Sequence, residues 1–184
     1  MTPSTASPPE SFARAVTGLR ALRPRAEIRL DEITAPQRLA PYAFALTANV
    51  ESQGDPEAAT GRLILLHDPA GHDAWDGTLR LVTYVCADLD PEVAADPLLP
   101  TVAWSWLTDA LAAAGADHHA AGGTVTQTSS TRFGDLAGEP ATAEVELRAS
   151  WTPEGEDLSK HLGAWCELLA TMAGLPPPGV ARIS

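Results

Sequence analysis

Two apolar stretches constrain the fold most, because Leu63 to Leu66 and Leu79 to Ala87 are apolar on both of their alternating faces. Strands with this pattern are buried on both sides, so we expect the pair to lie in the middle of a sheet. In the second stretch one face carries Val82, Tyr84 and Cys86, and the other carries Leu79, Leu81 and Val85.

Four further stretches read as strands. Residues 28–30, 42–50 and 145–151 alternate apolar with small, polar or charged residues, which indicates one buried face each. Residues 124–131 form a strand rich in Thr and Ser that is polar on both faces.

Three segments have helical spacing of their apolar residues. The first has a capping-box pattern from Ser7 to Glu10 and is stopped by Pro24. The second opens at 96–100 and ends near Gly115. The third can be capped by Asp157, runs along the stripe Leu158, Leu162, Trp165, Leu169 and Met172, and is closed by Gly174 and Pro176.

The order is therefore helix, four strands, helix, two strands, helix. Strands that occur in runs favour an α+β fold, with an antiparallel sheet of about six strands and three helices packed mainly on one face. We expect one domain over residues 8–175, a disordered N-terminus over 1–7 and a flexible tail over 176–184.

The formal net charge of −12 argues against a nucleic acid or a membrane as the main partner, since phosphate and anionic lipid are repelled. Arginines outnumber acidic residues only in the segment up to Ala40, and this basic end can still bind a partner locally. Two isolated cysteines, Cys86 and Cys166, suit a reducing compartment, and the N-terminus lacks the pattern of a signal peptide. We therefore expect a cytoplasmic protein.

The densest polar cluster, His67 to Gly77, lies between the two central strands. His67, Asp68, His72 and Asp73 are candidate ligand or metal contacts, because imidazole and carboxylate together suit a divalent ion or a general base. The competing interpretation is a long hairpin connection whose Asp-Pro, Ala-Gly and Asp-Gly pairs supply turn geometry. No metal is firmly assigned and no cofactor is predicted.

Candidate partner contacts are three tryptophans and one strand. Trp75, Trp104 and Trp106 can anchor a partner if exposed, although packing in the core is the favoured interpretation. Thr124, Thr126 and Thr128 can accept a partner strand at a sheet edge, or simply form a solvated edge.

Two smaller groups complete the candidates. His118 and His119 are expected in a loop without a third ligand. Arg20, Arg23, Arg25 and Arg29 can bind an anion such as RNA, but cations near a helix C-terminus are ordinary. The chain has no nucleophile elbow, phosphate loop, paired C-x-x-C or H-E-x-x-H motif, so no catalytic residue is assigned and an enzyme is not favoured.

Four segments, QRLAPYAFAL, GRLILLHDPAGHDAWDGTLRLVTYVCADLD, DPLLPTVAWSWLTDAL and ATAEVELRASWTP, carry a family resemblance. From Phe12 to Leu175 the chain resembles the actinobacterial proteins grouped as a domain of unknown function, number three thousand. The resemblance implies a cytoplasmic actinobacterial protein and a link to RNA metabolism, but no activity and no catalytic residue.

The element order is also similar to that of small dimeric secretion chaperones, with one extra strand, although a shared fold does not fix function. Our leading hypothesis is a non-catalytic protein-binding or adaptor domain, chaperone-like, that engages an unknown protein partner or itself as a homodimer. The alternatives are a metal-dependent hydrolase or small-ligand binder using the His67–Asp73 segment, and an accessory protein in RNA metabolism.

Overall fold

A computed structural model describes residues 7–179. Of the predicted disordered N-terminus (1–7) and flexible tail (176–184), residues 1–6 and 180–184 therefore lie outside the described residues. The helices are α1 (Glu10–Ala21), α2 (Pro91–Ala94), α3 (Leu99–Ala113) and α4 (Ser159–Met172), with a short 3-10 turn η1 (Gly134–Leu136). The strands are β1 (Ile28–Ile33), β2 (Tyr42–Ser52), β3 (Asp55–His72), β4 (Gly77–Leu89), β5 (His118–Ser130) and β6 (Thr142–Pro153).

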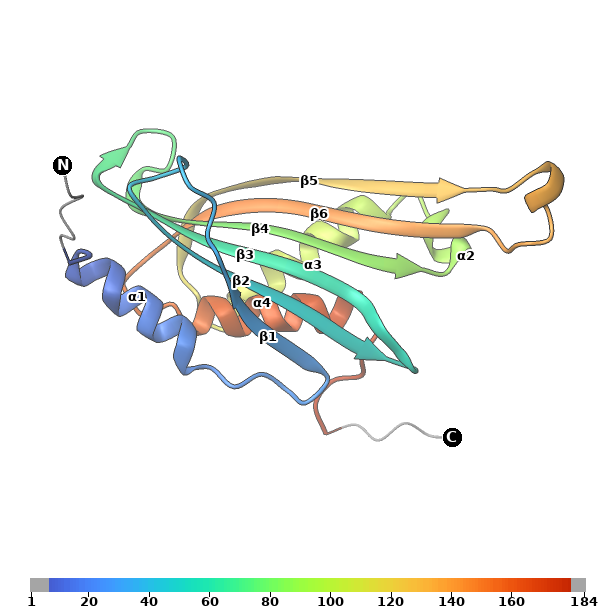
Figure 1. The fold of residues 1–184 in the computed structure, drawn as a ribbon, viewed down its shortest axis with the longest axis horizontal. Helices are drawn as coiled ribbons and strands as arrows, with labels where there is room; N and C mark the ends of the chain where they lie inside the picture. Colours follow the sequence, from blue (N-terminus) through green and yellow to red (C-terminus); the bar gives the residue numbers. More distant parts are fainter. Residues whose placement is uncertain (1–6, 180–184) are drawn as a thin grey trace.

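The strands form one antiparallel sheet in the order β1-β2-β3-β4-β6-β5 (Figure 1). This confirms the α+β class, the element order and the central position of β3 and β4. Neither α2 nor η1 was expected. Each is a single short turn that buries no residue, so no periodic apolar pattern marks it.

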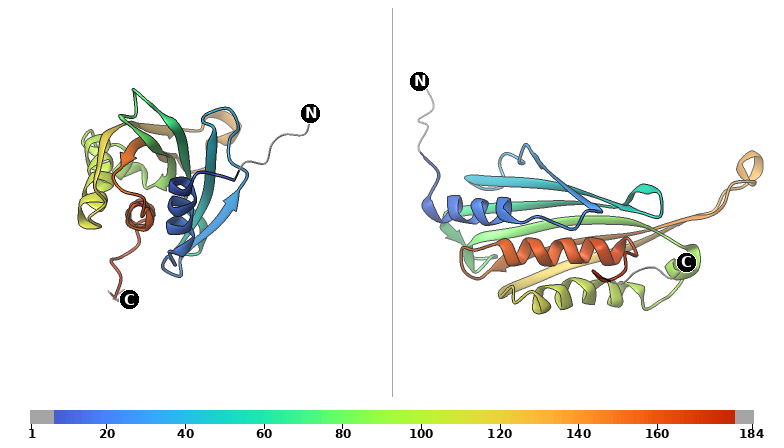
Figure 2. Two further views of the ribbon diagram at one scale, coloured as in Figure 1. Left: turned by 90° about the vertical axis from the view of Figure 1, so that its left-hand side faces the viewer. Right: turned by 90° about the horizontal axis from the view of Figure 1, so that it is seen from below.

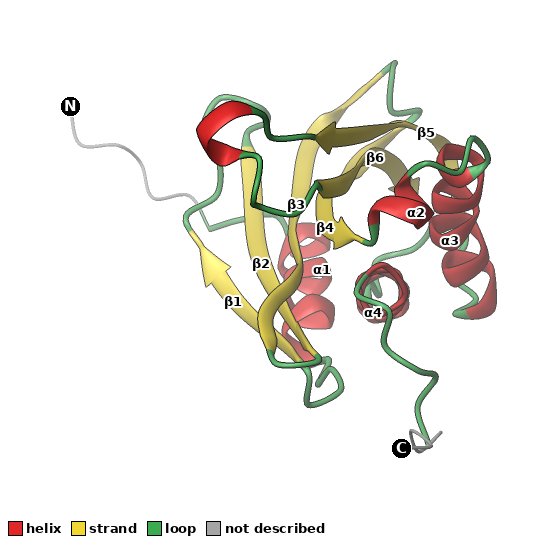
Figure 3. Ribbon diagram, turned by 90° about the vertical axis from the view of Figure 1, so that its right-hand side faces the viewer, coloured by secondary structure: helices red, strands yellow, loops and turns green. Residues whose placement is uncertain are grey.

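The three long helices cover one face of the sheet and leave the other face open (Figure 2). Figure 3 shows α4 end-on within the curve of the sheet, with α1 and α3 to either side. The predicted stripe of α4 is its buried side, because Leu162, Trp165, Leu169 and Met172 are all at most 3% exposed. We call the two sides of the sheet the helix face and the open face.

Residues that alternate along each strand divide between these faces. The helix face is the main core, with Leu46, Leu63, Leu81, Leu147 and Trp151 all buried. The open face carries the intervening residues, among them Arg62, Val82, Tyr84 and Arg148. The apolar residues on the two faces of β3 and β4 therefore have different surroundings. Those on the helix face belong to the core, and those on the open face form the floor of a surface hollow.

Two helix starts differ in detail from the expectation. The first helix begins after Pro9, and Ser7 makes no capping hydrogen bond, because two prolines already fix the backbone at this point. Glu10 instead pairs with Arg14 one turn later. The prediction for α4 was closer: the Oδ1 of Asp157 accepts a 3.0 Å hydrogen bond from the backbone N–H of Ser159.

The turns follow from local chemistry. Gln53 and Gly54 join β2 to β3 with φ of +54° and +84°, the conformation of a tight two-residue hairpin. The β5–β6 connection is longer and projects beyond the sheet, at the far right of Figure 1. We call residues 131–141 the tip; its Phe133 is 79% exposed.

Candidate functional site

The predicted strand at 124–131 lies in β5, the outermost strand on its side of the sheet (Figure 3). Thr124, Thr126 and Thr128 are exposed, and among the described strands only β6 pairs with β5. The strand is longer than predicted because it begins at His118 and continues past a bulge, where Ala120 has a φ of +51°. One long edge is therefore open to pairing.

The tryptophans contribute little to this edge. Trp104 and Trp106 are half-buried and pack against the core from α3, and Trp104 lies beneath Gly123 on the helix face. Trp75 is half-buried in the β3–β4 turn, where its ring stacks on His72 with centroids 4.9 Å apart. Packing accounts for all three indoles.

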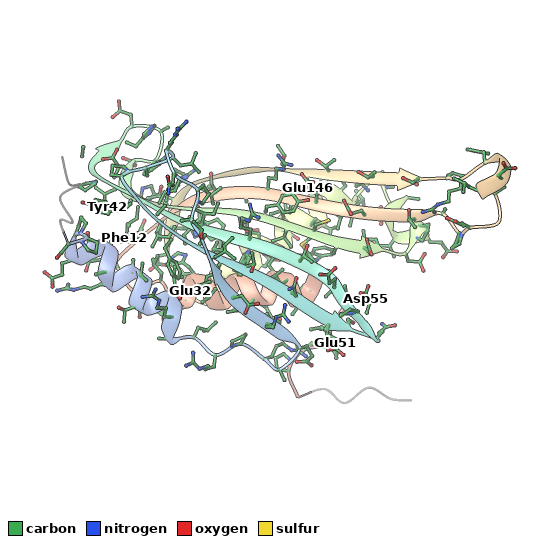
Figure 4. All side chains as sticks on the ribbon, in the orientation of Figure 1. Phe12, Glu32, Tyr42, Glu51, Asp55 and Glu146 are labelled. Atoms are coloured by element: carbon green, nitrogen blue, oxygen red, sulfur yellow. The ribbon has the colours of Figure 1, made fainter. Side chains whose placement is uncertain are left out.

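His67 is a strand residue and not part of a loop, which corrects the expectation of a long polar connection. It is 2% exposed on the helix face, and its ring lies 6.0 Å from the rings of Phe12 and Tyr42. Figure 4 shows Phe12 and Tyr42 together at this end of the sheet. His67 Nδ1 is 2.9 Å from the carbonyl oxygen of Thr78, while the buried Nε2 has no hydrogen-bond partner in the part of the chain that the structure describes.

The other members of the cluster serve the turn. The carboxylate of Asp68 accepts from the N–H of Ala70, and His72 Nδ1 accepts from the N–H of Ala74. Asp73 is exposed within the turn. His67 and His72 therefore do not converge, and within residues 7–179 no group of three or more His, Cys, Asp or Glu side chains is placed to hold a metal ion.

His118 and His119 lie at the start of β5 and not in a loop, because the strand extends to its pairing with Pro153. His119 Nε2 is 2.8 Å from the carbonyl oxygen of Asp76, and Nδ1 is 3.4 Å from Glu154. These contacts raise the pKa of His119, chiefly through the carbonyl of Asp76. The imidazole thus ties β5 to the β3–β4 turn.

The arginines of the basic N-terminal segment are largely neutralised. Arg20 pairs with Glu32, Arg25 with Glu27 and Arg29 with Asp31, at 2.7, 3.0 and 3.0 Å. Arg23 donates to the carbonyl oxygen of Arg20. Nothing in this geometry gathers them into a surface for phosphates.

A different set of residues, which the sequence did not single out, meets on the open face. Arg62, Tyr84 and Arg148 are neighbours across β3, β4 and β6, and they border a hollow of about 510 Å³. Burial and the adjacent Glu146 raise the pKa of Tyr84 to about 12, so its hydroxyl stays neutral. The alternation within each strand could have shown which face each of these residues occupies. The strand order that makes the three residues neighbours could not be predicted from the sequence.

The fold and this surface define a class: an antiparallel α+β sheet with helices on one side and an open, partly apolar face on the other. Within that class the chain belongs to the family described as protein of unknown function (DUF3000), whose model matches residues 8–181. Comparison with curated proteins and with solved structures gave no match. Among the described helices, none has the length and apolar character that crossing a membrane requires.

Proposed function

We propose that this protein is a non-catalytic binding protein that assembles as a homodimer by pairing β5 with the β5 of a second copy. The observation that carries the proposal is the edge itself. β5 is 13 residues long, ends its side of the sheet, and belongs to a stretch from Ala120 to Thr131 without a charged side chain.

Unpaired edges of this length invite strand addition unless charges, prolines or bulges protect them. The only irregularity in β5 is the bulge between His119 and Gly122, which leaves the part from Gly122 to Ser130 regular. Exposed Thr126 and Thr128 have β-branched side chains that favour extended pairing.

The lack of charge along β5 makes this edge the part of the surface where a second copy can approach. Two molecules that each carry a net charge of −12 repel each other over most of their surfaces. An uncharged strand avoids like-charge contact at the junction itself. Two-fold symmetry also makes such an edge self-complementary, because antiparallel pairing brings the same residues together from both copies.

A cytoplasmic location forms part of the proposal. The two cysteines are free thiols, Cys86 half-buried on the sheet and Cys166 buried in α4, as in proteins of reducing compartments. An actinobacterial source stays a prediction from the family resemblance, with which the eleven arginines and one lysine of the chain agree.

Size-exclusion chromatography with light scattering on the full chain, over a range of concentrations, tests the assembly. We expect a mass twice that of the monomer. The double variant Thr126→Lys with Thr128→Lys should be monomeric, because four lysines would face each other across the two-fold axis. The control is Thr17→Lys with Thr101→Lys, which adds the same charge at exposed positions on α1 and α3.

The control should remain dimeric. A wild-type chain that is monomeric at every concentration would overturn the proposal. So would a dimer that persists in the Thr126 and Thr128 double variant while both variants stay folded.

A further inference from the structure

The open face carries a small patch with unusual charge for this molecule. Pairing between the strands places Arg62 beside Tyr84 and Tyr84 beside Arg148, in one row across the sheet. The next row consists of Ile64, Val82, Ser150 and Gly122, again from β3, β4, β6 and β5. Arg80 precedes Val82 by two residues on the same face of β4, so cations lie on both sides of this row.

Among residues 7–179, two of these three arginines have no carboxylate partner. Within the described residues Arg62 makes no ion pair or side-chain hydrogen bond. Arg80 is 8% exposed, and its guanidinium donates only to hydroxyls, at 2.9 Å to Thr152 and 2.8 Å to Ser150. Because burial without a counter-ion disfavours the charge, the pKa of Arg80 is lowered.

The third arginine is held in place. Arg148 pairs with Glu146 at 2.6 Å, and its guanidinium carbon lies 5.3 Å from the centre of the Tyr84 ring. Figure 4 marks Glu146 on β6. The fixed guanidinium retains unused N–H donors for a ligand, since the planar group has five.

The space between the rows suits a small molecule. The hollow of about 510 Å³ falls in the size range of ordinary ligand sites. Half-buried Ile64 and Val82 form its floor, and Gly122 leaves one side empty, because a Cβ built there would meet no atom within 4 Å. None of the described residues that line the hollow is acidic, although acids outnumber basic residues by 24 to 12 in the chain.

We infer that this hollow binds a small organic carboxylate with a flat or branched hydrocarbon part. The carboxylate lies against the guanidinium groups of Arg62 and Arg148, and the hydrocarbon rests on Ile64 and Val82. Arg80 adds positive potential from the buried side through Ser150. Arginine matches a carboxylate because its parallel N–H groups can bind both oxygens.

The site is complete within one copy, although Gly122 and Thr124 lie on β5, the strand that the proposed dimer pairs. Its test therefore uses heat of binding and leaves the oligomeric state aside. The probe is 2-naphthoate, titrated calorimetrically into the full chain, with 2-naphthalenemethanol as a neutral molecule that has the same rings.

We expect the carboxylate to bind at least about tenfold more tightly than the alcohol, the effect of one charge-assisted hydrogen-bond pair. The variant Arg62→Gln should bind 2-naphthoate about tenfold more weakly than the wild type for the same reason. Gly122→Leu should abolish binding by filling the hollow. Arg14→Gln removes the same charge from α1, on the helix face, and should leave the affinity unchanged.

Equal affinity for the carboxylate and the alcohol would overturn the role of the arginines. Unchanged binding in both folded variants, Arg62→Gln and Gly122→Leu, would overturn the location. Inorganic phosphate that displaces 2-naphthoate at equal concentration would overturn the role of the apolar floor.

Discussion

The indole Nε1 of Trp165 in α4 donates a 2.7 Å hydrogen bond to the Oγ1 of Thr83 in β4. The same hydroxyl donates to the carbonyl oxygen of Arg62 in β3, at 2.9 Å. One buried threonine thus satisfies the polar atom of the largest side chain of α4 and faces the helix from the centre of the sheet. The helix cannot rotate about its axis without losing this contact.

Replacing Thr83 by Val keeps the shape but leaves the indole N–H buried without an acceptor. We expect a loss of about 1–3 kcal/mol in the free energy of unfolding, measured by urea denaturation. Thr83→Ser retains the hydroxyl and should lose clearly less. Equal stability of the Val and Ser variants would show that the hydrogen bond has no net effect.

A second contact of Trp165 predicts a steric effect. A Cβ added to Gly61 would lie 2.7 Å from Trp165 Cζ2, closer than two carbons can pack. Gly61→Ala should destabilise the fold by about 1–3 kcal/mol. Gly122→Ala is the matched control on the same sheet, since its Cβ meets nothing, and its stability should equal or slightly exceed that of the wild type. Thermal unfolding of both variants measures the difference.

The buried His161 predicts a dependence of stability on pH. Its Nδ1 accepts a 3.1 Å hydrogen bond from Trp151 Nε1, and burial lowers the pKa of His161 to about 4. The unfolded chain, with a pKa near ~6.5, binds a proton first as the pH falls. Stability is therefore complete above about pH 6.5 and declines as the pH falls towards 4, by up to roughly 3 kcal/mol.

Urea unfolding at several pH values measures this decline. Comparison with His161→Gln separates it from the titration of surface carboxylates, because Gln can still accept from the indole but does not titrate. The difference in stability between wild type and variant should change across this pH range. A constant difference would contradict the assignment of a neutral imidazole.

The two thiols should be unreactive in the folded protein. Burial is the main cause that raises the pKa of Cys86 and of Cys166 to about 12. Since the thiolate is the reactive form, a disulfide reagent at neutral pH should label neither cysteine in the native state and both in urea. Cys86→Ser assigns the signals. Rapid labelling of native Cys86 would show that this half-buried thiol is ionised.

Much of the fold follows from local patterns. The stripe from Leu158 to Met172 predicted the buried side of α4, and the apolar character of residues 63–66 and 79–87 predicted the two central strands. These features depend on periodicity within a single element, which sequence records directly. Short α2 has no period to read, and the early start of β5 at His118 depends on its pairing with β6.

The candidate sites were harder to predict from the sequence than the fold, because they depend on contacts between elements. His67 and His72 are close in sequence but differ in burial, since β3 extends through both and the turn starts only after His72. Arg62, Tyr84 and Arg148 are far apart in sequence and meet only because β6 lies next to β4. No pattern within one strand reports that order, which arises from packing of the whole sheet.

The tip at 131–141 has a practical consequence. Register along the sheet fixes β5 against β6, from His118 opposite Pro153 to Ser130 opposite Thr142, independently of the peptide link between them. Chain continuity at the tip is therefore dispensable for the sheet. New termini or an inserted reporter domain can be introduced beside Phe133, far from α4 and its core. This turn is therefore a suitable position for circular permutation or domain insertion.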